Sequence, residues 1–574
     1  MLQSTEQHLR RHERILVIVV EGAVGVHADR ADAADSVRLA ALGPNAILTL
    51  ATILTVGFVG LRLDFVPLWD GWAYAECAVD VVTNRFALYF LRCYGHPAYV
   101  YSGILATFQL IEVGNPVLLF LVNAGVLAAA TVGFHRLMRR LFPGDDHCID
   151  VALLTAAFLL QPAFLASVLQ PALDLPVLAG TVWCAVLLIE RRWFWCAVVG
   201  TAMAFSKETG VLLYGVLLAC YVGWVLARTP GTCGARLRAI LPVWLTVAPL
   251  AAYAGYVATF RFFRPGQAPV WGAPTGRPLL AELVTVRVGD ELVSYLGLLF
   301  VLNFAWLPSA WIATDTGVGA LRLLRRRPTR TVPGADRGAI GFLTLAAVVA
   351  LIALTRFITY SNVRYLMAGT ALLLAVAYVA LVRLGAAPAV RRIALGVYAV
   401  ALAVSAVRTV DPVSRAVWGT FPFGSHRMLD MTSITGECCG AGRDQLVYSL
   451  EFTRFHDLTD SVLVAMMRDT ATVLALPSRM HYHAVGRVDT TTWRRTLRRE
   501  GAFEATVMAG PVMLTLDTLP RSVIYIDMPN AKDPMTLGLL SRLYSIGPAQ
   551  RFAVDGYALS AYPLTLKNGD RSLP

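Results

Sequence analysis

A short stretch near the N-terminus gathers the residue types that general acid–base chemistry requires: carboxylates, a histidine and aromatic rings. Asp64, Asp70 and Tyr74 follow one hydrophobic run, and His96 precedes the next. Because these positions adjoin apolar segments, a partly dry environment would raise the basicity of a carboxylate and suit it to act as a general base. The alternative is an ordinary interfacial loop, in which the rings anchor at the membrane surface and the acids face water.

Two further charged positions lie in turns between hydrophobic runs. Asp174 lies in Gln-Pro-Ala-Leu-Asp-Leu-Pro, and a carboxylate so close to hydrocarbon is costly and therefore often functional. Its alternative role is to cap the following helix, which Pro176 would favour. Lys207 precedes Glu208 in a chain whose basic residues are nearly all arginine, which indicates a need for a compact ammonium group. The alternative is a Lys207–Glu208 pair that satisfies a helix break.

A third polar position, Arg364 followed by Tyr365, lies before a late hydrophobic run. Arginine suits phosphate because it offers two parallel hydrogen bonds and a permanent charge. Snorkelling of the side chain to lipid headgroups is the alternative. Acids, a histidine and cations together suit a reaction with an anionic leaving group, because fixed positive charge stabilises the charge that develops. A lipid phosphate is the anionic group most naturally delivered to a membrane protein.

Composition indicates the elements that must position these residues. Of 574 residues, 56% are hydrophobic and only 15% charged, against about 25% in an ordinary soluble domain. Repeated runs of about 18 apolar residues cannot all be buried in one soluble core. We therefore expect about eleven membrane-spanning helices, at 46–61, 116–134, 150–169, 172–189, 194–206, 210–227, 239–260, 292–313, 340–358, 365–382 and 393–407.

The distribution of arginine predicts the orientation of these spans. The segment 97–111 is short and contains polar residues, so we expect it to be interfacial or re-entrant. With a cytoplasmic segment at 1–42, the arginine clusters then fall in cytoplasmic loops, which carry little else of chemical interest. The large loop 62–115 and the polar positions above fall on the opposite side. The net charge of +12 thus reflects loops that flank spans rather than a nucleic-acid partner.

Residues beyond the membrane domain 43–410 have the composition of a soluble, extracytoplasmic domain, 411–574. Its patterns predict helices at 445–467 and 537–544 and strands at 471–476, 522–526, 552–554 and 557–566, which indicates a small α/β domain. His481 and His483 alternate as on one strand face, but further ligands at metal-site spacing are missing. We expect no defined cofactor, although a divalent metal stays open. The sequence lacks a phosphate-cradling glycine loop, which argues against an ATP-driven pump.

Two of the nine cysteines, Cys77 and Cys93, share the first loop. If that loop faces an oxidising compartment, a disulfide between them is possible in principle, and unpaired thiols are the alternative.

In order and type, these motifs resemble the GT-C membrane glycosyltransferases, especially the protein mannosyltransferase and aminoarabinose transferase branch. Gly71 stands where the family has the second acid of an Asp-Glu pair, and Ala98 replaces the second proline of His-Pro-Pro. The matching stretches, spread over about residues 45–410, are Asp70-Gly-Trp-Ala-Tyr74, His96-Pro-Ala-Tyr99, Asp174-Leu-Pro, Lys207-Glu-Thr and Arg364-Tyr365.

The resemblance implies transfer of a sugar from a polyprenyl-phosphate donor on the extracytoplasmic face of the inner or plasma membrane. By this analogy Asp70 is the general base, and Lys207 and Arg364 hold the lipid phosphate. The remaining candidate substrate-binding residues are Asp64, Tyr74, His96, Asp174, Glu208 and Tyr365. The acceptor stays open among lipid, glycan and protein.

Two other classes of function remain as alternatives. A polytopic transporter or lipid flippase would carry inverted repeats and acids at mid-span, and neither is visible in the sequence. A non-catalytic scaffold for envelope assembly is credible because the second acid is missing.

Overall fold

The structure is a computed structural model, and the chain divides into two compact units, residues 1–46 and 47–574. Asp64 and His96 lie outside the described residues, and Asp70 is described through its backbone only. The structure describes residues 43–60, 70–85, 98–230, 232–263, 290–326, 335–357, 362–407, 411–423, 426–429, 458–459, 461–462, 465–466, 472–476, 506–509, 519–527, 534–554 and 557–567.

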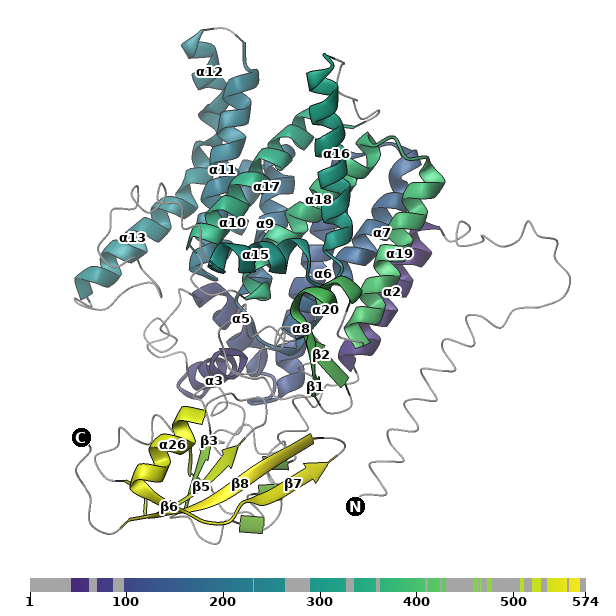
Figure 1. Cartoon of the computed structure of the whole chain (residues 1–574). Helices are drawn as coiled ribbons and strands as arrows, with labels where there is room; N and C mark the ends of the chain where they lie inside the picture. Colours follow the sequence, from purple (N-terminus) through teal and green to yellow (C-terminus); the bar gives the residue numbers. More distant parts are fainter. Residues whose placement is uncertain are drawn as a thin grey trace, which may run out of the picture. The chain divides into compact units, whose positions relative to one another are not determined.

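The chain is a polytopic helical membrane protein, as predicted (Figure 1). Within the described ranges, six helices are long and apolar enough to cross a membrane, and a pair bent by 49° makes a seventh candidate. Three shorter apolar helices match three further predicted runs: α2 (Pro44–Gly60), α9 (Asp174–Ile189) and α10 (Trp193–Ala204). The bent pair consists of η2 (Asp145–His147) with α7 (Cys148–Leu159) and of α8 (Pro162–Leu169). The six are α6 (Pro116–Leu141), α11 (Glu208–Arg228), α12–η3–α13 (Cys233–Ile240, Leu241–Val247, Ala248–Phe263), α17 (Arg337–Phe357), η4–α18 (Val363–Leu366, Met367–Arg383) and α19 (Pro388–Val407).

Besides the run 150–169, which the bent pair replaces, one further predicted run differs from the structure. The expected span 292–313 is two helices, α15 (Asp290–Phe300) and α16 (Trp306–Leu324). The helix stops because Asn303 and Phe304 adopt left-handed conformations, with φ of 56° and 60°. By contrast, the segment expected not to span contains only α5 (Tyr99–Gln109), whose 11 residues extend about 16 Å, too short for a hydrocarbon core of about 30 Å.

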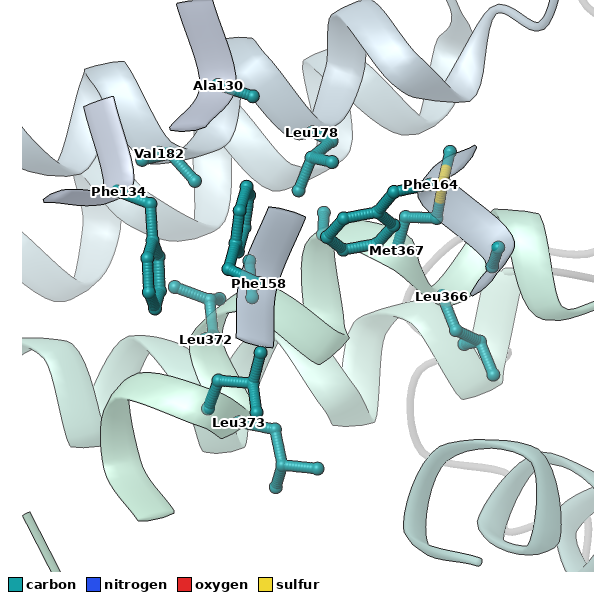
Figure 2. Packing of buried hydrophobic residues seen from close by; sticks show 14 of the residues in the cluster. Ala130, Phe134, Phe158, Phe164, Leu178, Val182, Leu366, Met367, Leu372 and Leu373 are labelled. Carbon is teal, nitrogen blue, oxygen red and sulfur yellow. The ribbon is translucent and has the colours of Figure 1, made fainter. Parts of the chain in front are cut away.

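Helices α9 and α18 form the interior of the helical bundle. Helix α9 packs against α6, α10, α11 and α18, while α18 also packs against α7, α16 and α17. Aromatic rings fill the neighbouring space: Phe134 and Phe158 stack with centroids 4.4 Å apart, and Phe158 meets Phe164 edge-on at 5.0 Å (Figure 2). Such close packing fixes the ends of α9 and α18, where two of the candidate site residues lie.

The predicted first loop contains a helix, α3 (Asp70–Thr83), that packs against α5. Tyr101 of α5 donates its hydroxyl to Asn123 of α6, and the Asn123 amide donates to the Val168 carbonyl of α8 at 2.9 Å. These buried bonds tie the loop to the turn that precedes α9. Cys77 of α3 is disulfide-bonded, so the unpaired alternative is wrong for this residue. Its partner lies outside the described residues, and pairing with Cys93 stays a prediction.

The C-terminal region contains the predicted α/β arrangement. A six-stranded sheet has the order β4-β3-β5-β8-β6, with β7 also paired to β8; β3 runs parallel to β4 and β5, and β8 is antiparallel to its neighbours. The bounds are β3 (Val473–Leu476), β4 (Thr506–Ala509), β5 (Ser522–Asp527), α26 (Pro534–Leu543), β6 (Tyr544–Ile546), β7 (Gln550–Val554) and β8 (Tyr557–Leu566).

Four of these strands and α26 match predicted segments, whereas β4 and β6 were not predicted. A separate hairpin, β1 (Thr420–Phe423) with β2 (His426–Leu429), was not predicted either, and it follows α20 (Pro412–Trp418). Most of the predicted helix 445–467, and His481 and His483, lie outside the described residues. The boundaries 1–42, 43–410 and 411–574 stay predictions.

Candidate functional site

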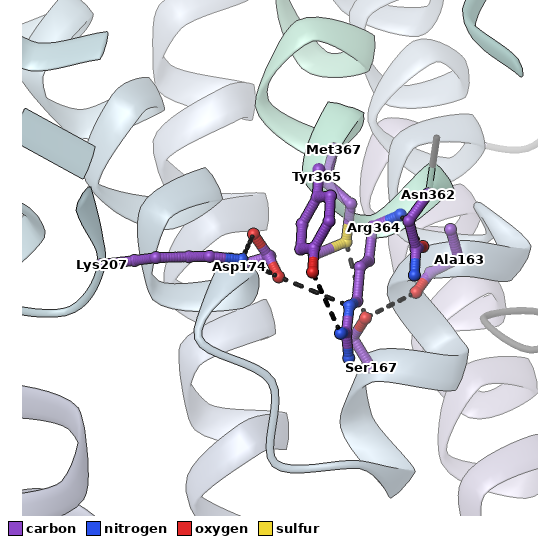
Figure 3. A network of polar contacts seen from close by, with 8 residues as sticks. All are labelled: Ala163, Ser167, Asp174, Lys207, Asn362, Arg364, Tyr365 and Met367. Atoms are coloured by element: carbon purple, nitrogen blue, oxygen red, sulfur yellow. Dashed lines mark hydrogen bonds and ion pairs between the residues drawn. The ribbon is translucent and has the colours of Figure 1, made fainter. Parts of the chain in front are cut away.

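Three turns that are far apart in the sequence bring an acid and two cations together. Lys207 donates from Nζ to both carboxylate oxygens of Asp174, at 2.7 and 2.9 Å. Arg364 Nε lies 3.8 Å from the same carboxylate. Figure 3 shows Asp174 between the two cations. All three side chains are nearly enclosed, with exposed fractions of 6% for Asp174, 8% for Lys207 and 11% for Arg364.

Tyr365 completes this cluster by contacting both cations. Its ring centroid lies 3.9 Å from Lys207 Nζ and 5.2 Å from the Arg364 guanidinium carbon. The Arg364 Nη2 group also donates to the Tyr365 hydroxyl at 3.4 Å. A ring face attracts cations, so the tyrosine holds the two charges near one another without direct contact. One acid and two cations leave these groups with a net charge of about +1 at neutral pH.

Lys207 reaches the interior because the chain breaks between two helices. Helix α10 has 12 residues and extends about 18 Å, so it ends well short of a full crossing. Lys207 then adopts an extended conformation, with φ −165° and ψ 155°, before α11 starts. A Cβ at Gly210 would lie 2.1 Å from the Met203 carbonyl oxygen, so this tight hairpin requires glycine there.

The structure argues against one local explanation for Asp174 and one for Lys207. The N-cap of α9 is Leu173, without a side-chain cap, so Asp174 does not serve as the capping residue. Lys207 donates to a carboxylate 33 positions away, so a pair confined to Lys207 and Glu208 does not account for its position. A buried charge needs a partner of this kind, because leaving it alone in a low-dielectric interior is costly.

The predicted base opens a helix that lies beside the Asp174 turn. Asp70 is the first residue of α3, and Gly71 is buried against the turn. A Cβ at position 71 would lie 3.2 Å from Gln170 Oε1 and 3.3 Å from Pro171 Cδ. A larger side chain would therefore push α3 away from the turn. This close approach gives a steric reason for glycine where the resembling family has a second acid.

Two further predicted site residues, Tyr74 and Glu208, lie among the described residues. Tyr74, one helical turn after Asp70, is half-buried and packs against the cluster shared by α3, α5 and α6. Glu208 is half-buried and is the first residue of α11, directly after Lys207. Among the described residues, no group of three His, Cys, Asp or Glu side chains could hold a metal ion.

A second buried charge cluster was missed in the sequence. Asp150, fully buried in α7, accepts hydrogen bonds from Arg391 Nε at 2.8 Å and from the Tyr378 hydroxyl at 3.0 Å. His147 Nδ1 lies 2.7 Å from the same hydroxyl. These bonds join α7 to α18 and α19. An acid at the first position of an apolar run was the available signal for this cluster.

Comparison with known proteins places the fold. No family model matches the chain, and no curated protein matches it. Two solved structures of ArnT from Cupriavidus metallidurans do match, each with 13% identity over 90% of this chain. The structure bound to undecaprenyl phosphate has a TM-score of 0.48 and is covered over 97% of its length. The apo structure has a TM-score of 0.50 and is covered over 98%.

At this level of identity the likeness concerns the fold, and it extends through almost the entire length of both chains. ArnT is the aminoarabinose transferase of the GT-C superfamily, the branch that the sequence motifs resemble. The chain therefore has an ArnT-like fold.

Proposed function

We propose that this protein is a membrane glycosyltransferase that moves a sugar from a polyprenyl-phosphate donor to an acceptor hydroxyl on the extracytoplasmic face. One observation carries the proposal: Lys207, Asp174, Arg364 and Tyr365 form a buried cluster of net positive charge inside the helical bundle. The GT-C fold supports it, because that fold belongs to a transferase in the matching structure.

The leaving group explains why two cations are useful. In the donor the phosphate is a diester with a single negative charge. As the sugar–oxygen bond breaks, its electron pair passes to the phosphate oxygen and a second negative charge develops. Arg364 offers a planar pair of donors to such oxygens, and Lys207 is held beside it. Fixed charges in an enclosed site stabilise this developing charge without needing to reorganise.

Asp70 is the proposed general base. The acceptor oxygen attacks the anomeric carbon from the face opposite the phosphate, and its proton passes to the Asp70 carboxylate. The start of α3 packs against Gln170 and Pro171, four and three positions before Asp174, so this base would act close to the cations. The configuration at the anomeric carbon inverts. Glu208 and Tyr74 are proposed to contact the substrates, together with Asp64 and His96.

The decisive assay measures transfer of label from radiolabelled polyprenyl-phosphate pentoses and hexoses into lipid, glycan and protein fractions. Membranes containing the full chain are compared with membranes holding equal amounts of the Asp70→Asn variant. Loss of the base should lower transfer by about 100-fold or more. Asp80→Asn makes the same change on the same helix and should leave transfer unchanged.

Equal transfer by Asp70→Asn and the unmodified protein would remove Asp70 from the mechanism. Absence of transfer with every sugar would contradict the enzyme proposal and favour a transporter, a flippase or a scaffold.

A further inference from the structure

Four aromatic rings from three elements meet at the helix break that carries Lys207. Tyr99 opens α5, Phe205 follows α10, and Tyr253 and Tyr256 lie on α13. Neighbouring ring centroids are 5.6 to 5.9 Å apart. The Val100 amide donates to the Phe205 carbonyl at 3.1 Å, which fixes the start of α5 to the end of α10. All four rings are half-buried, so part of each remains accessible.

This aromatic cluster also carries polar groups. The hydroxyls of Tyr99 and Tyr256 lie 3.2 Å apart, and Glu208 starts α11 at the same helix break as Phe205. The Tyr253 hydroxyl is buried and has no hydrogen-bond partner among the described residues. A buried hydroxyl without a partner is unfavourable, and a ligand can supply what the protein does not. Rings with a few fixed polar groups are typical of small-molecule sites.

We propose that this cluster binds the sugar ring of the lipid-linked donor, an inference that rests on the proposed function of the cation cluster. Phe205 lies two positions before Lys207, at the same helix break. The sugar is bonded directly to the phosphate, so a phosphate at Lys207 and Arg364 places the sugar beside this helix break. The apolar face of the sugar packs against the rings, and its hydroxyls bond to Tyr253 and Glu208.

A membrane-interface belt is the competing explanation for a group of tyrosines. In such a belt the ring lies among lipids and the hydroxyl points to water. Here the Tyr253 hydroxyl is buried, and Tyr99 comes from a helix too short to span. The rings also pack against one another rather than singly.

The test compares two probes on purified full-length protein: a bare polyprenyl phosphate, and the same lipid carrying a labelled pentose or hexose. Tyr256→Leu should weaken binding of the sugar-bearing lipid by roughly three- to tenfold, the scale of one aromatic contact, and should leave the bare lipid unaffected. Tyr253→Phe, which removes only the hydroxyl, should also weaken binding of the sugar-bearing lipid and leave binding of the bare lipid unchanged.

Trp224→Leu is the matched control, because Trp224 belongs to a separate aromatic group near the far end of α11, with Tyr221 and Phe342. It should bind both probes normally. If Tyr256→Leu weakens binding of both probes equally, or of neither, the sugar assignment is wrong. Arg364→Gln separates the two proposals, because it should weaken binding of both probes. Unchanged binding of the bare lipid would contradict the proposed function.

Discussion

At the scale of single residues, the Asp174–Lys207 pair stabilises the folded chain and belongs to the proposed phosphate site. The pair is buried and doubly hydrogen-bonded, so removing one partner strands the other charge in the interior. Arg364 and Tyr365 share the same surroundings, and the excess positive charge of the cluster depends on Arg364. Stability and activity should therefore respond differently to single and paired substitutions.

Lys207→Met should destabilise the folded protein by about 3–5 kcal/mol, because the Asp174 carboxylate loses its ammonium partner. Adding Asp174→Asn removes the stranded charge, so the double variant should regain most of that stability. Thermal unfolding of the purified protein measures both effects. Sugar transfer should stay low in the double variant, since the lysine is still absent. Recovery of transfer together with stability would show that the pair has only a structural role.

At the scale of elements, helix breaks create the site. Lys207 lies where α10 ends early, and Arg364 lies in the 3₁₀ turn before α18. The Asn362 side chain accepts from the Arg364 amide at 3.1 Å and so stabilises that turn. The α10–α11 break further depends on Gly210, where α11 passes close to the backbone of α10.

Gly210→Ala should therefore displace Lys207 and abolish transfer, because the new Cβ would lie 2.1 Å from the Met203 carbonyl oxygen. We expect a loss of stability of about 1–3 kcal/mol, measured by thermal unfolding. Gly223→Ala is the control on the same helix, since nothing lies within 4 Å of a Cβ there. Full transfer by Gly210→Ala would mean that the geometry of this break does not matter for activity.

Elements differed in how well the sequence predicted them. Apolar runs predicted most helices because the length and composition that a membrane requires of a helix are properties of one continuous segment. The break after α15 was missed because the 301–306 turn is held by a distant group: Asp411 accepts from Trp306 Nε1 at 3.1 Å. The short strands β4 and β6 were missed because each is stabilised by pairing with a distant strand. The contact of Gly71 with the Asp174 turn depends likewise on tertiary packing.

At the scale of the whole molecule, the predicted orientation can be compared with the chemistry of the cysteines. Disulfides persist in oxidising compartments, so the bonded Cys77 supports an extracytoplasmic first loop. Cys233 is a free, exposed thiol at the start of α12, between Arg228 and Arg236. The arginine distribution assigns that segment to the cytoplasm.

A membrane-impermeant maleimide should therefore label Cys233 only after the cells are permeabilised. Ser545→Cys, placed on the exposed part of β6, should be labelled in intact cells if the C-terminal domain is extracytoplasmic. Mass spectrometry of the labelled peptides distinguishes these sites, and Cys233→Ser gives the background. Labelling of Cys233 in intact cells would reverse the predicted orientation and place the cation cluster near the opposite face.

Binding of a labelled polyprenyl phosphate to the purified full-length protein tests the central claim most directly. Arg364→Gln should weaken binding by about ten- to 100-fold, since hydrogen bonds to a charged group contribute about 1.5–3 kcal/mol each. Arg415→Gln changes an exposed arginine of α20 and should bind the lipid as the unmodified protein does. Equal affinity of Arg364→Gln and the unmodified protein would contradict a phosphate site at Lys207 and Arg364.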